Sequence, residues 1–212
     1  MKKTIINDNK DLLDKEFECV LIGAGGFARE ILAEVYLQYK ITLKCYVDDE
    51  YWHNGLYKIS QFNPENQKAL IAVGNPSDKI KLINKLPKHT KYWNYISPNA
   101  YVNGLKLGVG NFICAGVIIT TNVSIGNHIH LNLQTTIGHD SILDDYVTTA
   151  PSVNISGNVS IGKAVYLGTK SCIREKTKIC ENVILGMNAG VVSDIVESGV
   201  YVGTPAKRIK NI

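Results

Sequence analysis

A histidine and an acid stand next to each other in the second half of the chain, within residues 134–140, which read QTTIGHD. The imidazole of His139 can take a proton from an attacking amine or hydroxyl, and such general-base assistance accelerates a reaction about 10²–10⁴-fold. The carboxylate of Asp140 can hold the ring in one tautomer, as in a catalytic triad. Spacing alone supports a plain surface histidine as well as it supports a catalytic base.

A glycine-rich segment near the start of the chain is the second candidate site. Residues 23–28 read GAGGFA and match the fingerprint G-x-G-x-x-G/A, in which backbone amides meet a phosphate at a helix N-terminus. Asp48, at the end of the next apolar run, is placed to accept a hydrogen bond from a ribose hydroxyl. The segment lacks a second mononucleotide half, which favours a mononucleotide or nucleotide sugar over NAD. A purely structural turn is the other interpretation.

Alternating strands and helices must position these glycines. Strands are predicted at 19–22, 42–47 and 69–73, and a helix follows the first and the third of them. The first helix is expected to bury one apolar face, and Ser77 is expected to cap the second helix. The residues of that apolar face are Ala28, Ile31, Leu32, Val35, Tyr36 and Tyr39. The order is a βαβαβ pattern, typical of a Rossmann-like α/β domain.

A different periodicity positions His139. From Leu107 to Val191 every sixth residue is Leu, Ile or Val in fourteen of fifteen cases, with Thr149 as the exception. Neither a helix nor an alternating strand has this period, whereas the hexapeptide repeat of a parallel β-helix does. Three hexads make one coil, so residues 107–196 predict five coils after an irregular first one. Asn, Asp and Gly at 126–127, 144–145, 157–158 and 181–182 are expected to form corners with left-handed backbone angles.

Composition excludes several classes of protein. The chain has 212 residues and a formal net charge of +4, too small to indicate a nucleic acid partner. Five cysteines without a C-x-x-C pair predict a reduced, cytoplasmic compartment. The polar first residues do not resemble a signal peptide, and no apolar run has the length of a membrane span.

Together with the ending VGTPAK at 202–207, these features resemble the NeuD/PglD-like family, the sialic acid O-acetyltransferases and nucleotide-amino-sugar N-acetyltransferases. The similarity covers residues 18–210. It implies a left-handed parallel β-helix and a homotrimer with active sites between neighbouring helices. It also implies acetyl-CoA as co-substrate, no metal, and a nucleotide-sugar or sugar acceptor. The implied division is an extension at 1–17, a Rossmann-like nucleotide-sugar domain at 18–95 and a β-helix acyltransferase domain at 96–212.

The resemblance also assigns roles to residues. It implies His139 as general base, Asp140 as its support, a Gly157 N–H on the thioester oxygen, and Asn132 near the sugar. The matching nucleotide positions are Gly23, Gly25, Phe27, Asp48, Asp49 and Gly74, and the coenzyme A positions are Gly157, Thr148, Thr169 and Met187. Phe27 and Thr148 replace histidines of some members, and Met187 replaces a glycine. The acceptor and the choice between N- and O-transfer therefore stay open.

The expected reaction is direct attack of a sugar amine or hydroxyl on acetyl-CoA in a ternary complex, for surface-glycan synthesis. Two other classes stay open. His128, His130 and His139 could form a zinc site like that of γ-class carbonic anhydrases, although outward histidines along a subunit seam fit their spacing better. A nucleotide-sugar sensor without catalysis would bind the nucleotide but not coenzyme A. Cys114, Cys172 and Cys180 are expected to be small fillers or surface thiols.

Overall fold

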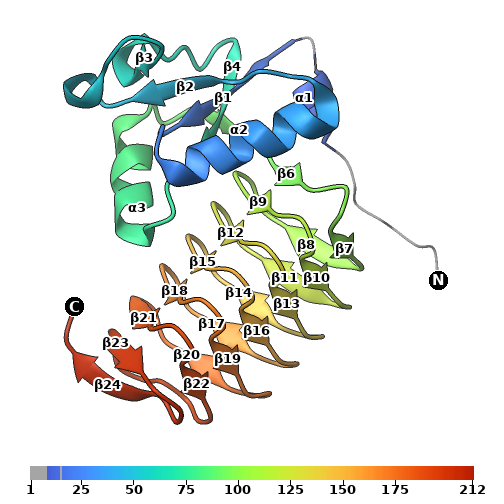
Figure 1. Cartoon of the computed structure of the whole chain (residues 1–212), viewed down its shortest axis with the longest axis vertical. Helices are drawn as coiled ribbons and strands as arrows, with labels where there is room; N and C mark the ends of the chain where they lie inside the picture. The colour runs from blue at the N-terminus through green and yellow to red at the C-terminus, as the bar shows by residue number, and fades with distance from the viewer. Residues whose placement is uncertain (1–8, 15) are drawn as a thin grey trace. The chain divides into compact units, whose positions relative to one another are not determined.

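The computed structural model describes residues 9–14 and 16–212, and the chain divides into two units (Figure 1). The first unit is Asn9–Tyr95 and the second begins at Ile96 and runs to Ile212. Of the N-terminal extension expected at 1–17, residues 1–8 and 15 lie outside the described residues. Each unit is considered by itself.

The first unit is a five-stranded parallel sheet with the strand order β3-β2-β1-β4-β5. Its strands are β1 (Glu18–Ile22), β2 (Lys44–Val47), β3 (Tyr57–Lys58), β4 (Gln67–Ile71) and β5 (Lys91–Tyr92). The helices are α1 (Lys10–Leu13), α2 (Gly26–Tyr39) and α3 (Pro76–Lys85), with 3₁₀ turns η1 (Asp49–Tyr51) and η2 (Ile59–Gln61). After β1 the chain forms β2, which pairs with one edge of β1. After β3 it returns and forms β4, which pairs with the other edge of β1. The carboxyl ends of β1 and β4 therefore flank a topological switch point, where open α/β sheets bind ligands.

The central strands form the core of this unit because their side chains are apolar on both faces. Val20, Ile22, Ala69 and Ile71 are completely buried, as expected for a parallel sheet covered by helices. The expected apolar face of α2 is too wide, because Ala28, Ile31 and Val35 are buried but Tyr36 is 52% exposed. Tyr36 follows Val35 directly and so points about 100° away around the helix.

The second unit is a parallel β-helix of short strands stacked into three sheets (Figure 1). The first sheet contains β6 (Tyr95–Ile96), β9 (Phe112–Ile113), β12 (His130–Leu131), β15 (Thr148–Thr149), β18 (Tyr166–Leu167), β21 (Val183–Leu185), β23 (Gly199–Val202) and the antiparallel β24 (Lys207–Lys210). The second contains β7 (Tyr101–Val102), β10 (Ile118–Ile119), β13 (Thr136–Ile137), β16 (Asn154–Ile155), β19 (Cys172–Ile173) and β22 (Gly190–Val191). The third contains β8 (Leu105–Leu107), β11 (Val123–Ile125), β14 (Ile142–Leu143), β17 (Ser160–Ile161) and β20 (Lys178–Ile179).

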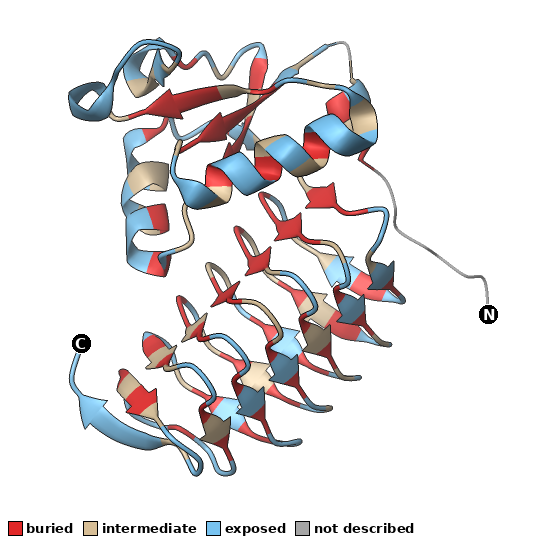
Figure 2. Cartoon of the chain, in the orientation of Figure 1, coloured by how far each residue is buried: buried red, intermediate tan, exposed pale blue. Residues whose placement is uncertain are grey.

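The six-residue period appears as columns of buried side chains through the coils. Ile119 pairs with Ile137, which pairs with Ile155 and then Ile173, and all four are buried. Figure 2 shows buried residues recurring from coil to coil along the β-helix. The hexapeptide prediction is therefore confirmed. The irregular first coil that was expected before Leu107 is present, because β6 and β7 already belong to the sheets. Val102 precedes Leu107 by five residues instead of six, which hides this first coil from a strict six-residue pattern.

The corners differ in part from the expectation. Asn158 and Asn182 have positive φ angles of 58° and 55°, as predicted for asparagines at corners. At 126–127 and 144–145, however, the left-handed residue is the one that follows, His128 and Tyr146. The N–H of Tyr146 donates to the Asn127 carbonyl of the coil before, at 2.8 Å. This repeated hydrogen bond supports the left-handed angle in residue types that otherwise avoid it.

Candidate functional site

His139 lies at the corner that follows β13, with its neighbour Asp140 beside it. Nδ1 of the imidazole is 2.7 Å from Oδ2 of Asp140, and the histidine side chain is 57% exposed. An ionised carboxylate only accepts hydrogen bonds, so Nδ1 carries a hydrogen and donates a hydrogen bond to Asp140. In the neutral form of this tautomer, Nε2 carries the lone pair that a general base needs.

Asp140 is held from the opposite side by a residue that the sequence analysis missed. The side-chain amide of Asn122 donates to Oδ1 of Asp140 at 2.6 Å, from the same corner one coil earlier. The hydrogen bond from Asn122, and then that from His139, lower the pKa of Asp140 below its ordinary value. Asp140 is therefore an anion at neutral pH, with one oxygen bound on each side. The available signal was the eighteen-residue separation of Asn122 and Asp140, which is one coil.

Gly157 stacks on His139 from the following coil. A Cβ added to Gly157 would lie 2.6 Å from Nε2 of His139, so the ring packs directly against the glycine backbone. The next amide, that of Asn158, donates to the His139 carbonyl at 2.7 Å. Among the described residues no hydrogen-bond acceptor is found for the Gly157 N–H itself. The corner thus places an imidazole beside a backbone N–H, which are groups of the kind that can assist acyl transfer.

The expected coenzyme A residues other than Gly157 do not join His139 within one chain. Thr169 and Met187 follow β18 and β21, on the corner between the first and second sheets, and Met187 is 74% exposed. Thr148 lies on β15, paired with His130 and Tyr166. His139 lies instead at the corner between the second and third sheets, a full strand away along the coil.

Asn132 follows β12 on the same corner as Thr169 and Met187. Its side-chain oxygen accepts from the Leu133 N–H at 2.7 Å, and its own N–H donates to Thr149 Oγ1 at 2.9 Å. Thr149 is the one polar residue in the aliphatic column, and it also shares a hydrogen bond with Thr135 Oγ1 at 2.9 Å. The break in the hexad pattern therefore fixes the backbone of Asn132.

The other two histidines of the β-helix are buried, whereas the sequence analysis expected them to face outward along a subunit seam. His128 stacks on Tyr146 with ring centroids 5.5 Å apart, a packing role that sequence spacing did not reveal. Within residues 9–14 and 16–212, no three His, Cys, Asp or Glu side chains come together as a metal would need. Of the three cysteines in this unit, Cys114 is buried, Cys180 is partly buried and Cys172 is exposed.

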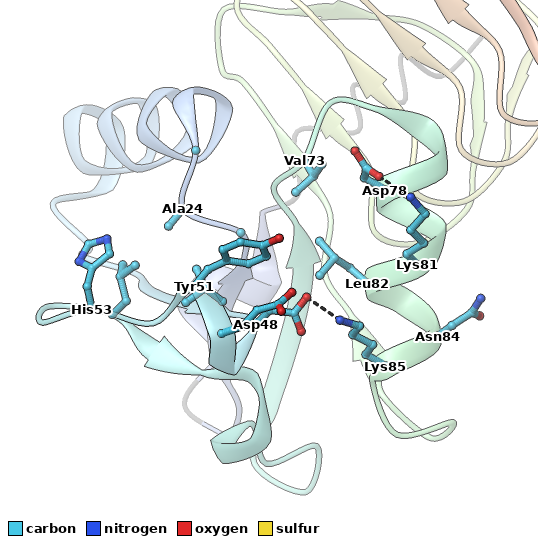
Figure 3. Close-up of a pocket in the computed structure, with 15 residues that line it drawn as sticks. Ala24, Asp48, Tyr51, His53, Val73, Asp78, Lys81, Leu82, Asn84 and Lys85 are labelled. Carbon is cyan, nitrogen blue, oxygen red and sulfur yellow. Dashed lines mark hydrogen bonds and ion pairs between the residues drawn. The ribbon is translucent and has the colours of Figure 1, made fainter.

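The first unit contains a pocket of about 800 Å³ at the carboxyl ends of β1, β2 and β4 (Figure 3). Three expected nucleotide residues line it: Gly23, Gly25 and Asp48. The wall provided by α3 and the loop after β2 was not predicted, because nothing in the spacing of their residues shows that they close on the glycine loop. Those wall residues are Glu50, Tyr51, His53, Leu56, Asp78, Lys81, Leu82, Asn84 and Lys85.

An ion pair crosses this pocket. Nζ of Lys85 on α3 is 2.6 Å from Oδ2 of Asp48, whose side chain is only 17% exposed (Figure 3). The hydrogen bond with Asp48 raises the pKa of Lys85. The pocket therefore holds an oriented carboxylate beside a fixed cation and, at Gly23–Gly25, the loop that leads into α2. A ribose hydroxyl and a phosphate are the chemical groups that fit such a lining.

Three other expected nucleotide residues do not line the pocket. Asp49 accepts hydrogen bonds from the Ser60 hydroxyl at 2.7 Å and the Ser60 N–H at 3.3 Å, so its carboxylate stabilises the loop after β2. Those bonds, the hydroxyl first, lower the pKa of Asp49. Phe27 lies in the first turn of α2, and Gly74 lies just after β4.

No helix in the described part of the chain has the length and apolar character needed to cross a membrane.

Comparisons with known proteins agree with both units. Residues 18–86 match the family model for the PglD N-terminal domain. A GDP-perosamine N-acetyltransferase of Escherichia coli O157:H7 is 35% identical over 79 residues, which are 37% of this chain and 36% of that enzyme. The chain thus aligns with only about a third of the length of this curated relative.

Two solved structures match almost the whole chain. The acetyltransferase domain of PglB from Neisseria gonorrhoeae FA1090, in complex with acetyl coenzyme A, is 26% identical with a TM-score of 0.79, covering 91% of this chain and 98% of that one. PerB from Caulobacter crescentus, in complex with CoA and GDP-perosamine, is 25% identical with a TM-score of 0.81, covering 91% and 97%. The fold is the left-handed β-helix acetyltransferase fold preceded by a Rossmann-like sheet. The chain therefore resembles the NeuD/PglD-like sugar acetyltransferases in both units, and its residues 18–86 match the PglD N-terminal domain.

Proposed function

We propose that this chain transfers an acetyl group from acetyl-CoA to the amino group of a nucleotide-linked sugar. The observation that carries the proposal is the corner formed by His139, Asp140 and Gly157, with a 2.7 Å bond between the imidazole and the carboxylate. The similarity to a GDP-perosamine N-acetyltransferase favours an amine over a hydroxyl as acceptor.

The proposed mechanism is direct attack. Nε2 of His139 takes the proton from the sugar amine as its nitrogen bonds to the thioester carbonyl carbon, and Asp140 stabilises the resulting imidazolium. The Gly157 N–H donates to the carbonyl oxygen as it becomes negative. When the carbon–sulfur bond breaks, the imidazolium returns the proton to the departing thiolate, so the enzyme ends as it began.

The pocket of the first unit is the proposed site for the nucleotide of the acceptor. Asp48 accepts from a ribose hydroxyl, and the amides around Gly23 and Gly25 meet a phosphate. This division of labour would separate acceptor recognition from the chemistry at His139.

We further propose a homotrimer, in the cytoplasm and serving surface-glycan synthesis, in which coenzyme A lies between subunits. Thr169 and Met187 lie at a different corner from His139, so within one chain the expected coenzyme A residues do not lie around His139. The exposed aliphatic side chains of Ile118 and Ile142, before and after the His139 corner, are suited to burial against a neighbouring copy.

The test is release of coenzyme A thiol from acetyl-CoA in the presence of UDP-, GDP-, dTDP- and CMP-linked sugars, each with and without an amino group. Thiol release with an amino sugar, and none with its hydroxyl counterpart, is the expected result. Release that is equal with and without any sugar would contradict an acceptor role, and release only with hydroxyl sugars would contradict N-transfer.

A further inference from the structure

Asn122 lies at the same corner as His139, one coil earlier, and contacts the carboxylate that holds the imidazole. The amide nitrogen of Asn122 donates to Oδ1 of Asp140 at 2.6 Å, while Oδ2 of the same carboxylate accepts from His139 at 2.7 Å. We propose that Asn122 is a positioning residue of the active site, which acts through Asp140 to orient His139. The inference rests on the proposed function.

A second asparagine–aspartate pair in the β-helix shows what a purely structural contact of this kind looks like. At the neighbouring corner, Asp145 Oδ1 accepts from both the N–H and the side-chain amide of Asn127, at 2.7 and 3.0 Å. The side-chain oxygen of Asn127 in turn accepts from the Val109 N–H at 2.9 Å. In this pair the side chains therefore satisfy backbone amides of successive coils. Asn122 instead bonds a carboxylate whose other oxygen holds a histidine, and it satisfies no backbone amide in the described structure.

Asn122 restricts the rotation of the Asp140 carboxylate. Both residues are exposed and have left-handed backbones, with φ of 57° and 59°, which fixes the directions of their Cβ atoms. With one oxygen bound from each side, the carboxylate cannot rotate away from Nδ1. Without Asn122, Oδ1 would turn to water, and the ring would lose the orientation that places Nε2 against Gly157.

The charge around this cluster is simple. Within the described chain, the same corner carries Thr121 and Asn122 in the coil before His139, and Gly157 and Asn158 in the coil after it, none of which titrates. The adjacent strands present Thr136 and Asn154, also uncharged and hydrogen bonded to each other. Among these residues Asp140 is the ionisable one, bonded to the imidazole. The next charged residues along the same corner are Glu175 and Lys176, one coil beyond Gly157, whereas position 122 lies on the opposite side of Asp140.

The first variant is Asn122→Ala, with Asn182→Ala as its matched control. Asn182 is also an exposed corner asparagine, with φ of 55°, so both variants carry the same backbone strain, but Asn182 lies at another corner two or more coils away. We expect Asn122→Ala to lower kcat about tenfold, with KM for both substrates within about twofold, because ring orientation and not binding is lost. The control keeps the wild-type kcat.

The second variant, Asn122→Asp, tests whether position 122 is electrostatically coupled to the imidazole across Asp140. An added negative charge beside Asp140 favours the protonated imidazole, so the acid limb of the pH–kcat/KM profile moves to higher pH by about half a unit to one unit. An unmoved acid limb, or an Asn122→Ala enzyme with the kcat of its control, would overturn the inference.

A measurement without turnover separates this inference from the proposed function. In full-length protein, ¹⁵N NMR of the His139 ring reports its tautomer. We expect the Nδ1–H form in the wild type and in Asn182→Ala, and a mixture of tautomers in Asn122→Ala. An unchanged tautomer in Asn122→Ala overturns the positioning role even if the enzyme is active, whereas a wild type inactive toward every acceptor counts against the proposed function alone.

Discussion

The backbone of Gly157 is in direct contact with the imidazole of His139: a Cβ on the glycine would lie 2.6 Å from Nε2 and 2.8 Å from Cε1. Real Cβ contacts are never this short, so any larger residue at 157 must displace the ring. The reactive nitrogen of the proposed base is therefore positioned by two neighbouring coils, with Asp140 on Nδ1 and Gly157 against Nε2.

Gly157→Ala should lower kcat at least tenfold with little effect on the melting temperature, because the displaced partner is the half-exposed end of a side chain. Steady-state kinetics and thermal unfolding measure the two quantities. Ser156→Ala, the exposed neighbour, is the control and should behave as wild type. A Gly157→Ala enzyme with normal kcat would mean that the ring does not need this position.

Two glycines of the nucleotide loop should differ sharply in their tolerance of a methyl group. Gly23 has a φ of 119° and would bring a Cβ within 3.0 Å of the Ala72 carbonyl oxygen, whereas a Cβ at Gly25 meets nothing within 4 Å. Gly23→Ala should reduce the free energy of unfolding by about 1–3 kcal/mol, and Gly25→Ala by less than about 1 kcal/mol. Urea unfolding of both variants decides this, and equal stabilities would contradict the strain at Gly23.

Lys85 should contribute to nucleotide binding through its ion pair with Asp48. Lys85→Met removes the cation and leaves the Asp48 carboxylate unpaired in the pocket, so the Kd for a nucleoside diphosphate should rise about tenfold. Isothermal titration calorimetry measures the Kd, and Lys88→Met, at an exposed lysine outside the pocket, is the control. Equal affinity in both variants would show that the ion pair does not contribute to nucleotide binding.

Restoring the aliphatic pattern at position 149 should destabilise the protein. Thr149→Val leaves the Asn132 N–H and the Thr135 hydroxyl without their buried partner, which costs about 1–3 kcal/mol. Chemical unfolding of Thr149→Val, Thr135→Val and the double variant tests this as a cycle. Because the two hydroxyls bond each other, the double variant should lose less stability than the two single losses added. Strict additivity, or a more stable Thr149→Val, would contradict the role of this pair.

Repetition decided how much of the fold could be predicted. The hexad column from Leu107 onward is set by local spacing, and the structure keeps it in register through Ile119, Ile137 and Ile155. The first coil was predicted only as an irregular one, because Val102 and Leu107 are five residues apart instead of six. Left-handed corner angles were predicted from residue type alone. Tyr146 nevertheless has a positive φ, because its N–H donates a hydrogen bond to the preceding coil that offsets the cost of this angle.

The site was predictable where it is local and not where it depends on packing. His139 and Asp140 are adjacent in sequence, and their hydrogen bond was expected. Asn122 required counting one full coil backward, which the repeat allows but the histidine motif does not suggest. The α3 side of the pocket, with Lys85 reaching Asp48, depends on where the chain returns to the sheet after β4. No local pattern encodes that return.

The most direct test of the account is the kcat of His139→Asn with the best acceptor of the sugar panel, beside the affinity of the same variant for coenzyme A. Asparagine retains a polar side chain but cannot take up the proton, so kcat should fall about 10²–10⁴-fold while the Kd for coenzyme A stays within about twofold. A variant that turns over at the wild-type rate would show that His139 is not the base, and the proposed mechanism would have to be abandoned.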